Sequence, residues 1–371
     1  MALSIQAVHN RLDLRRWHAL GEQVYRPYPL HRSTGDDIAH WLIGGKSLFC
    51  RHASITPYLL KNGWHAVGRF ALIRDERRPE VVQVAFFEAL PGLEGVRDAI
   101  LLKARAMHPE CADIVVGLDG HLNYACGFLV DRHDEPPVFG LPYTPPYYLD
   151  YFEGLRRRDM VSYRFQNQGF YDLRRVVEPA LDLSGVTIRL WDKRQFAREM
   201  DIYTHLNNVC FHDHPYWAAR QSSEDQELFE GFKWFLDDDH LIIAEKEGQP
   251  IGFLLWYPDF NELVGPGQAL GVKALLKYRA LKAAGRHPIK AVRLTEIAVH
   301  PAHRSRKVLA GMTMKMIERV EASGHLFTEG GFIFEENQSS IGYTLAYISR
   351  AMGREPEPFR RYCLFEGELR S

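Results

Sequence analysis

VGRFALIRD at residues 67–75 and IGFLLWYPD at residues 251–259 decide the fold. Each reads as a strand that follows a hairpin turn, at Asn62-Gly63 in the first case and at Gly248-Gln249 in the second. The two stretches are offset by 184 residues (251 − 67), which is about half of the 371-residue chain. The pattern predicts an internal duplication.

The elements around these two strands repeat in the same order. Each half reads strand, helix, helix, three strands, helix, strand, and the second half carries an insertion at about 265–288. A Pro- and Gly-containing linker at 178–185 separates the halves. We therefore predict an α/β protein with an N-terminal domain at 1–178 and a C-terminal domain at 186–371. Each domain is expected to be a mixed, mostly antiparallel sheet flanked by helices.

Composition narrows the class of protein. Hydrophobic residues make up 46% and charged residues 25% of the chain, and the net charge is −1. This balance makes nucleic acid an unlikely partner, and no apolar run is long enough for a membrane span or a signal peptide. The five cysteines form no CxxC pair. We expect a cytoplasmic protein with no membrane partner and no metal.

Several motifs carry a resemblance to a known family. They are Ile251-Gly252-Phe253, Tyr257 to Asn261, Ile297 to Pro301 with Arg304, Phe332 to Asn337, Arg361-Tyr362 and, in the first half, Leu141 to Tyr148. In this order they resemble the GNAT superfamily of N-acyltransferases, and in particular bacterial tandem GNAT-like proteins of poorly defined function. The resemblance implies two tandem GNAT-like domains. It also implies transfer of an acyl group from acyl-CoA, with acetyl-CoA foremost, to an amine of a small molecule.

The resemblance also implies where the acyl donor binds. The central strand of the second half would contact the thioester and pantetheine, and the next helix N-terminus would receive the pyrophosphate. Asn337 matches a residue that touches pantetheine. The implied cofactor-binding residues are Ile297, Ala298, Val299, Arg304, Arg306, Lys307, Val308, Leu309 and Asn337. However, Lys307 and Leu309 stand where the family has glycines. Shifting the alignment of the motif by two residues matches only one glycine, Gly311. Side chains there would crowd a backbone that must approach phosphate closely.

Two residues are implied to act in the chemistry. Glu296, on the central strand, is the candidate general base that deprotonates the amine. Tyr343, on the last helix, is the candidate general acid for the departing thiolate. Each has a plainer interpretation that stays open, as a solvent-facing strand carboxylate for Glu296 and as a core aromatic residue for Tyr343.

Other polar groups allow two interpretations each. Asp259 and Asn261 are candidate substrate residues or parts of a turn, and Asn337 fits a helix cap equally well. The insertion predicts a basic amphipathic helix, which is either a solvated face or a contact for an acidic group. His212-Asp213-His214 lacks a third spaced ligand, so we expect no metal there.

The two halves differ in their fitness for catalysis. After the central strand of the first half, the loop at 91–96 carries Glu94 where phosphate would lie, so we expect this domain to be non-catalytic. Two other functions remain open. One is an aminoacyl-tRNA-dependent transferase of the tandem GNAT type, and the other is a non-catalytic binding module. As for partners, the chain is compatible with a homodimer.

Overall fold

The computed structural model describes residues 3–32, 36–231, 233–268 and 270–370. The chain forms two compact units. Residues 1–160, 265–269 and 360–371 make up the first unit, and residues 161–264 and 270–359 make up the second. Within the described residues, no helix combines the length and the apolar character needed to cross a membrane.

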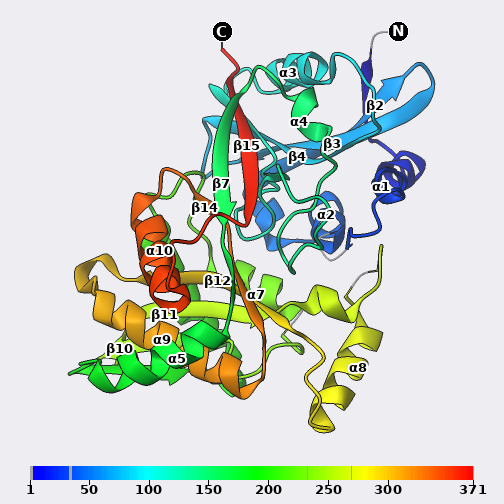
Figure 1. The fold of residues 1–371 in the computed structure, drawn as a ribbon. Helices are drawn as coiled ribbons and strands as arrows, with labels where there is room; N and C mark the ends of the chain where they lie inside the picture. The colour runs from blue at the N-terminus through cyan, green and yellow to red at the C-terminus, as the bar shows by residue number, and fades with distance from the viewer. Residues whose placement is uncertain (1–2, 33–35, 232, 269, 371) are drawn as a thin grey trace. The chain divides into compact units, whose positions relative to one another are not determined.

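The first unit is built on a sheet of strand order β1-β2-β3-β4-β5-β15-β7 (Figure 1). Its elements are β1 (Ser4–Ala7), α1 (Arg11–Tyr25), α2 (Asp36–Ile43), β2 (Ala53–Asn62), β3 (His65–Asp75), β4 (Val81–Ala89), α3 (Val96–Met107), β5 (Asp113–Val116), β6 (Phe128–Leu129), α4 (Tyr148–Tyr151), β15 (Arg360–Glu368) and the first part of β7 (Arg156–Ser162). β4 and β5 are parallel, whereas β1 to β4 are antiparallel neighbours. An apolar core that includes Phe70, Val84 and Phe365 covers one face.

The second unit has the sheet order β8-β13-β12-β11-β10-β9. Its elements are β8 (Arg164–Gln166), α5 (Gln168–Val177), β9 (Val186–Leu190), α6 (Phe196–Phe211), α7 (Ser222–Glu230), β10 (Leu241–Lys246), β11 (Gln249–Pro258), α8 (Val272–Ala283), β12 (Ala291–Val299), α9 (Arg306–Ala322), β13 (Phe327–Gly330), β14 (Ile333–Phe334) and α10 (Gln338–Met352). α9 packs on β9 to β12, and its stripe Val308, Met312, Met316 and Val320 completes the core on that side. α6 packs against β11 and β12.

The predicted fold class is confirmed, because two mixed sheets flanked by helices follow the same element order. The units nevertheless differ from the predicted boundaries 1–178 and 186–371. β8 and α5 belong to the second unit, where Phe327 pairs with Gln166, and the last strand β15 belongs to the first, where Phe365 pairs with Val116. A strand joins whichever sheet edge offers free backbone groups, and position in the sequence does not determine that edge.

Both units contain the same irregularity beside the same glycine. β12 has one extra residue, Thr295, relative to β11, and β4 has one extra residue relative to β3 near Phe86, whose φ is 52°. A Cβ on Gly252 would lie 2.9 Å from the carbonyl oxygen of Ala298, and one on Gly68 would lie 2.9 Å from that of Glu88. The repeated glycine therefore permits a close approach of neighbouring strands, which explains its presence in both quoted stretches.

Gly252→Ala is expected to lower the free energy of unfolding by about 2 kcal/mol, because the new methyl group meets backbone that cannot move aside cheaply. Urea denaturation followed by tryptophan fluorescence measures the change. The control is Gly342→Ala on α10, where a Cβ meets no atom within 4 Å and helix propensity favours alanine by up to ~1 kcal/mol. Equal effects of the two substitutions would contradict the close-approach argument.

Candidate active site

The site begins where β12 parts from β13. The parallel pairing runs from Ala291 and Phe327 to Leu294 and Gly330, and the Gly331 amide then donates to the Leu294 carbonyl at 2.7 Å. Beyond this point β12 continues to Val299 while pairing with β11 on its other edge. Within the described part of the chain, no side chain hydrogen-bonds the backbone of residues 297–299. The strand end therefore offers backbone groups to a ligand.

The bulge at Thr295 sets the direction of the Glu296 side chain. In an unbroken strand, residues three apart point to opposite faces, so Arg293 and Glu296 would lie on different sides. The extra residue returns Glu296 to the face covered by α6, where Tyr203 and Asn207 lie. Ile297 and Val299 then pack with the opposite core, against α9.

Glu296 is half-buried and is held through one oxygen. Tyr203 Oη donates to Oε2 at 3.0 Å, and Asn207 Nδ2 donates to the same atom at 2.7 Å. Burial raises the pKa of Glu296, and the two donors act against that rise. The second oxygen, Oε1, has no hydrogen-bond partner among the described residues. A partly desolvated carboxylate with one fixed and one available oxygen has the properties of a general base.

Asn207 leaves a further polar atom at this place. Its side chain is 99% buried and its amide nitrogen is engaged by Glu296, yet Oδ1 has no partner in the described residues. Because Oδ1 and Nδ2 belong to the same carboxamide, Oδ1 lies close to the Glu296 carboxylate. An unsatisfied buried acceptor is costly unless a ligand or water satisfies it. Glu296 and Asn207 together therefore suit a group that donates several hydrogen bonds.

Tyr343 lies on α10 and points at α9. Its hydroxyl is 2.9 Å from Thr313 Oγ1, which itself donates to the Leu309 carbonyl, so the tyrosine donates to the threonine. Burial raises the pKa of Tyr343 well above its usual value, so the phenol holds its proton. The ring also contacts Tyr347 at a centroid distance of 4.7 Å. Action as an acid requires the hydroxyl to leave Thr313.

The N-terminus of α9 is open and basic. Ser305 is the N-cap residue but makes no side-chain cap, and Arg304 and Arg306 are exposed beside it. Lys307 instead pairs with Asp182 at 2.9 Å. Gly311, the one glycine recovered by the shifted frame, lies against Leu183 and Ile188, where a Cβ would come within 2.9 Å of Leu183 Cδ1. Gly311 therefore serves helix packing rather than phosphate approach.

Three other candidates occupy local structural positions. The Asn337 side chain caps α10 by accepting from the Ser340 amide at 3.1 Å. Asp259 Oδ1 accepts from the Asn261 amide at 3.1 Å, and both residues are buried in the turn after β11. These contacts match the cap and turn interpretations, and roles toward pantetheine or substrate remain predictions.

In the first unit, tyrosines fill the equivalent strand end. Tyr147 donates to the Ala89 carbonyl at 2.8 Å, and Tyr148 accepts from the Ala89 amide at 3.0 Å while donating to Glu88 at 2.5 Å. Tyr151 donates to the Leu90 carbonyl. The backbone groups that an acyl donor would contact in this unit are therefore already hydrogen-bonded to tyrosine side chains.

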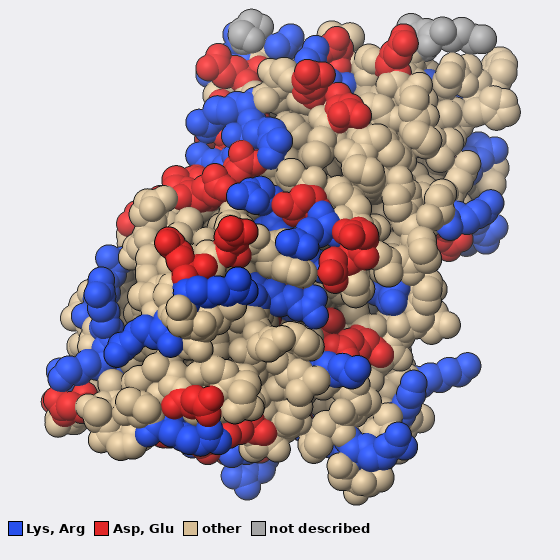
Figure 2. Space-filling model, in the orientation of Figure 1, with Lys and Arg blue, Asp and Glu red and all other residues tan. Residues whose placement is uncertain are grey.

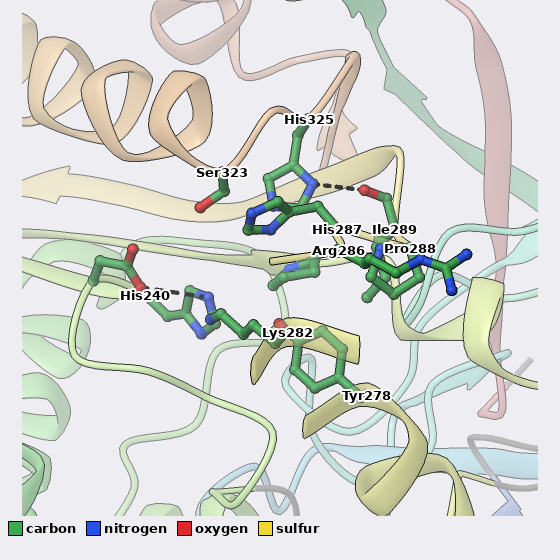
Figure 3. Close-up of a pocket in the computed structure, with 11 residues that line it drawn as sticks. His240, Tyr278, Lys282, Arg286, His287, Pro288, Ile289, Ser323 and His325 are labelled. Carbon is green, nitrogen blue, oxygen red and sulfur yellow. Dashed lines mark hydrogen bonds and ion pairs between the residues drawn. The ribbon is translucent and has the colours of Figure 1, made fainter. Parts of the chain in front are cut away.

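A small pocket in the second unit is lined in part by Asp239 and His240 (Figure 3), which also belong to a group of potential metal ligands that has the wrong donors. Asp237, Asp239 and His240 bring ligand atoms within 4.8 Å of one another. However, His240 Nδ1 accepts from the Asp237 amide, and burial lowers the pKa of His240 to about 4. The neutral ring thus carries its proton on Nε2, the atom that would have to bind the ion. Asp237 is also paired with Arg279 and Lys282.

His212-Asp213-His214 lies outside both groups of potential metal ligands found in the described residues. His212 pairs with Asp213 at 3.0 Å, whereas the ring of His214 packs on Phe334 at 5.1 Å. The structure thus turns the two histidines toward different partners.

Tyr203 and Asn207 are the site residues that the sequence analysis missed. They are four residues apart on α6, a spacing that places polar groups on one helix face. That face is buried, and a buried polar pair is a signal in principle. Sequence alone, however, does not show that this face meets Glu296.

The comparisons with known proteins agree with the fold. No protein-family model matches the chain. Protein YghO of Escherichia coli (strain K12) is 26% identical over 153 residues, and the match spans 39% of this chain and 38% of that protein.

Solved structures match over the whole chain. A tandem GNAT protein from the clavulanic acid biosynthesis pathway has a TM-score of 0.53 at 12% identity, covering 99% of both chains. A probable N-acyltransferase from Enterococcus faecalis V583 has a TM-score of 0.54 at 7% identity, covering 100% of this chain and 73% of that one. A glucosamine N-acetyltransferase region of a fungal multi-domain β-N-acetylglucosaminidase has a TM-score of 0.56 at 13% identity, over 99% of this chain and 38% of that one. The chain therefore has the tandem GNAT fold, and at these identities the likeness concerns the fold alone.

The raised pKa of Glu296 predicts a stability difference between the wild type and Glu296→Gln. The folded state keeps the proton above the ordinary value near 4.5, while the unfolded state loses it there. Between the ordinary and the raised pKa the folded state binds more protons, so its stability falls as pH rises. The wild type should therefore lose stability relative to Glu296→Gln across this window, as measured by urea denaturation at a series of pH values. Glu335→Gln, an exposed control, should show no such trend, and a gain of wild-type stability with rising pH would contradict the assignment.

Proposed function

We propose that the chain is an N-acyltransferase that moves an acyl group from acyl-CoA, acetyl-CoA foremost, to a small-molecule amine in the second unit. The observation that carries the proposal is Glu296, held by Tyr203 and Asn207 beside a strand end with available backbone groups. The tandem GNAT fold supports the reaction class, since acetyltransferases occur among proteins of this fold. The acyl donor, the acceptor and the residue roles belong to this proposal.

The chemistry follows from the positions of these groups. Glu296 Oε1 takes a proton from the acceptor ammonium, directly or through water, and the free amine attacks the thioester carbonyl. The developing oxyanion is stabilised by a backbone N–H at the end of β12. The C–S bond then breaks, the acylated nitrogen loses its second proton to water, and Tyr343 protonates the thiolate after its hydroxyl leaves Thr313 and then regains a proton from solvent.

The positive charge at the α9 N-terminus suits the phosphates of the acyl donor. Its shape suits them less well, because Lys307 and Leu309 stand where the family has glycines. Arg304 and Arg306 supply exposed cations, and the first amides of α9 point outward without a side-chain cap. In the first unit, tyrosine hydroxyls already bind the backbone at the strand end where an acyl donor would bind. We therefore expect one donor site per chain.

Isothermal titration of the full chain with acetyl-CoA is expected to give one site per chain. Arg304→Ala/Arg306→Ala should weaken binding about tenfold or more, because two cations that contact phosphate are lost. The control is Arg198→Ala, an exposed arginine on α6 whose guanidinium bonds Gln195. No binding of acetyl-CoA or of longer acyl-CoAs would overturn the proposal and leave a different donor or a non-catalytic role.

Asn207→Ala is expected to shift the acid limb of the kcat/KM profile to higher pH. The substitution removes a donor that stabilises the Glu296 carboxylate, so the pKa of that group rises. Thiol release from acetyl-CoA with a panel of primary amines supplies the rates. Asn208→Ala is the matched control, because Asn208 lies next to Asn207 but bonds the Arg220 backbone instead. A shift of equal size in both variants would contradict the role of Asn207.

A further inference from the structure

The inserted segment at about 265–288, together with the residues that flank it, concentrates positive charge in a chain that is nearly neutral. Residues 263–295 contain no Asp or Glu, although these types make up 47 of the 371 residues. The same segment carries seven cations, which are Lys273, Lys277, Arg279, Lys282, Arg286, Lys290 and Arg293. A net charge of −1 therefore conceals a local cationic region. The acetyl-transfer chemistry proposed above makes no use of it.

α8, at the centre of this segment, has two apolar faces instead of one. Ala274 and Tyr278 are buried and fix the helix to the second unit. A second stripe faces solvent, at the spacing i, i+4, i+8, i+11 that keeps residues on one side of a helix. Its members are Val272, Leu276, Ala280 and Ala283. Val272 is 72% exposed and Leu276 is 64% exposed, which marks a face without a partner among the described residues.

Cations border the exposed stripe on both sides. Lys273 and Lys277 are exposed on one flank, whereas Arg279 and Lys282 occupy the other and pair with Asp237. The Trp234 carbonyl accepts from Arg279, and the Trp234 side chain is 61% exposed. In Figure 2, basic side chains stand among uncharged ones at the place that α8 occupies in Figure 1. We define the stripe residues with Trp234, Lys273 and Lys277 as the α8 patch.

We propose that the α8 patch binds the surface of an anionic lipid bilayer. Valine, leucine and tryptophan can enter the boundary of the acyl chains while the lysines extend to lipid phosphates. A helix presents a convex surface, which a bilayer accepts without a complementary groove, whereas a protein partner would have to supply one. Charge complementarity therefore selects an anionic lipid surface. This revises the expectation of no membrane partner, which rested on the lack of a span and on net charge.

The binding is reversible and needs both kinds of residue. A few exposed apolar side chains give only weak partitioning by themselves, and each cation near an anionic surface strengthens it about fivefold. Binding should accordingly require anionic lipid and weaken with added salt. It should not depend on acyl-CoA, since the α8 patch shares no residue with the candidate active site.

The test is flotation of the full-length protein with vesicles of phosphatidylcholine alone and of phosphatidylcholine mixed with phosphatidylglycerol. The wild type is expected to float only with the mixed vesicles. Lys273→Glu/Lys277→Glu should reduce the partition coefficient by about tenfold or more, and Val272→Ser/Leu276→Ser should reduce it at unchanged charge. All four positions are exposed, so circular dichroism should show an intact fold.

Two controls distinguish binding through the α8 patch from nonspecific binding of the protein to vesicles. Leu102→Ser removes a leucine that is 70% exposed on α3, and Lys246→Glu reverses an exposed lysine on β10. Both should float as the wild type does. Absence of wild-type flotation with the mixed vesicles would overturn the proposal, as would α8 variants that float undiminished. Binding of the wild type to polyglutamate but not to vesicles would also overturn it, in favour of an acidic protein partner.

Discussion

The second unit depends on the separation of β12 from β13 after Leu294 and Gly330. Two strands that begin as parallel neighbours and then part leave a strand edge whose backbone groups have no ladder partner. The extra residue at Thr295 lies at the same point and turns Glu296 toward α6. One irregularity thus produces both the available strand end and the orientation of the candidate base. The regular elements around it, α9 on one face and α6 on the other, hold that irregularity in place.

The two units show that the same fold can leave the end of its central strand available or cover it with side chains. Both have the extra residue on the central strand, and both have a glycine whose missing Cβ lets the neighbouring strand approach. In the first unit Asp119 accepts from the amide of the bulged Phe86 at 2.7 Å, and tyrosines of the 147–151 region bind the strand end. In the second unit the equivalent backbone stays available. The two units therefore share this architecture, while side chains decide whether the strand end is hydrogen-bonded by them.

Sequence patterns predicted the fold class and the order of elements, because alternation, turn residues and helical stripes are local properties. They did not predict that β15 completes the first unit or that β8 and α5 join the second, since strand exchange depends on which sheet edge is free. Glu296 was proposed from the family resemblance of the strand motif, whereas its partners Tyr203 and Asn207 were not proposed, because helix packing brings them there. Gly311 was matched to the phosphate loop by its spacing, but its neighbours Leu183 and Ile188 show a packing role.

The central claim is that the end of β12 and the start of α9 receive the acyl donor while the first unit stays closed. Hydrogen–deuterium exchange with and without acetyl-CoA tests it directly, because a bound donor slows exchange of the amides it covers. Slower exchange is expected at residues 297–299 and 304–308, with no change at residues 89–96. Slower exchange at residues 89–96, or no change in either region at saturating acetyl-CoA, would contradict this claim.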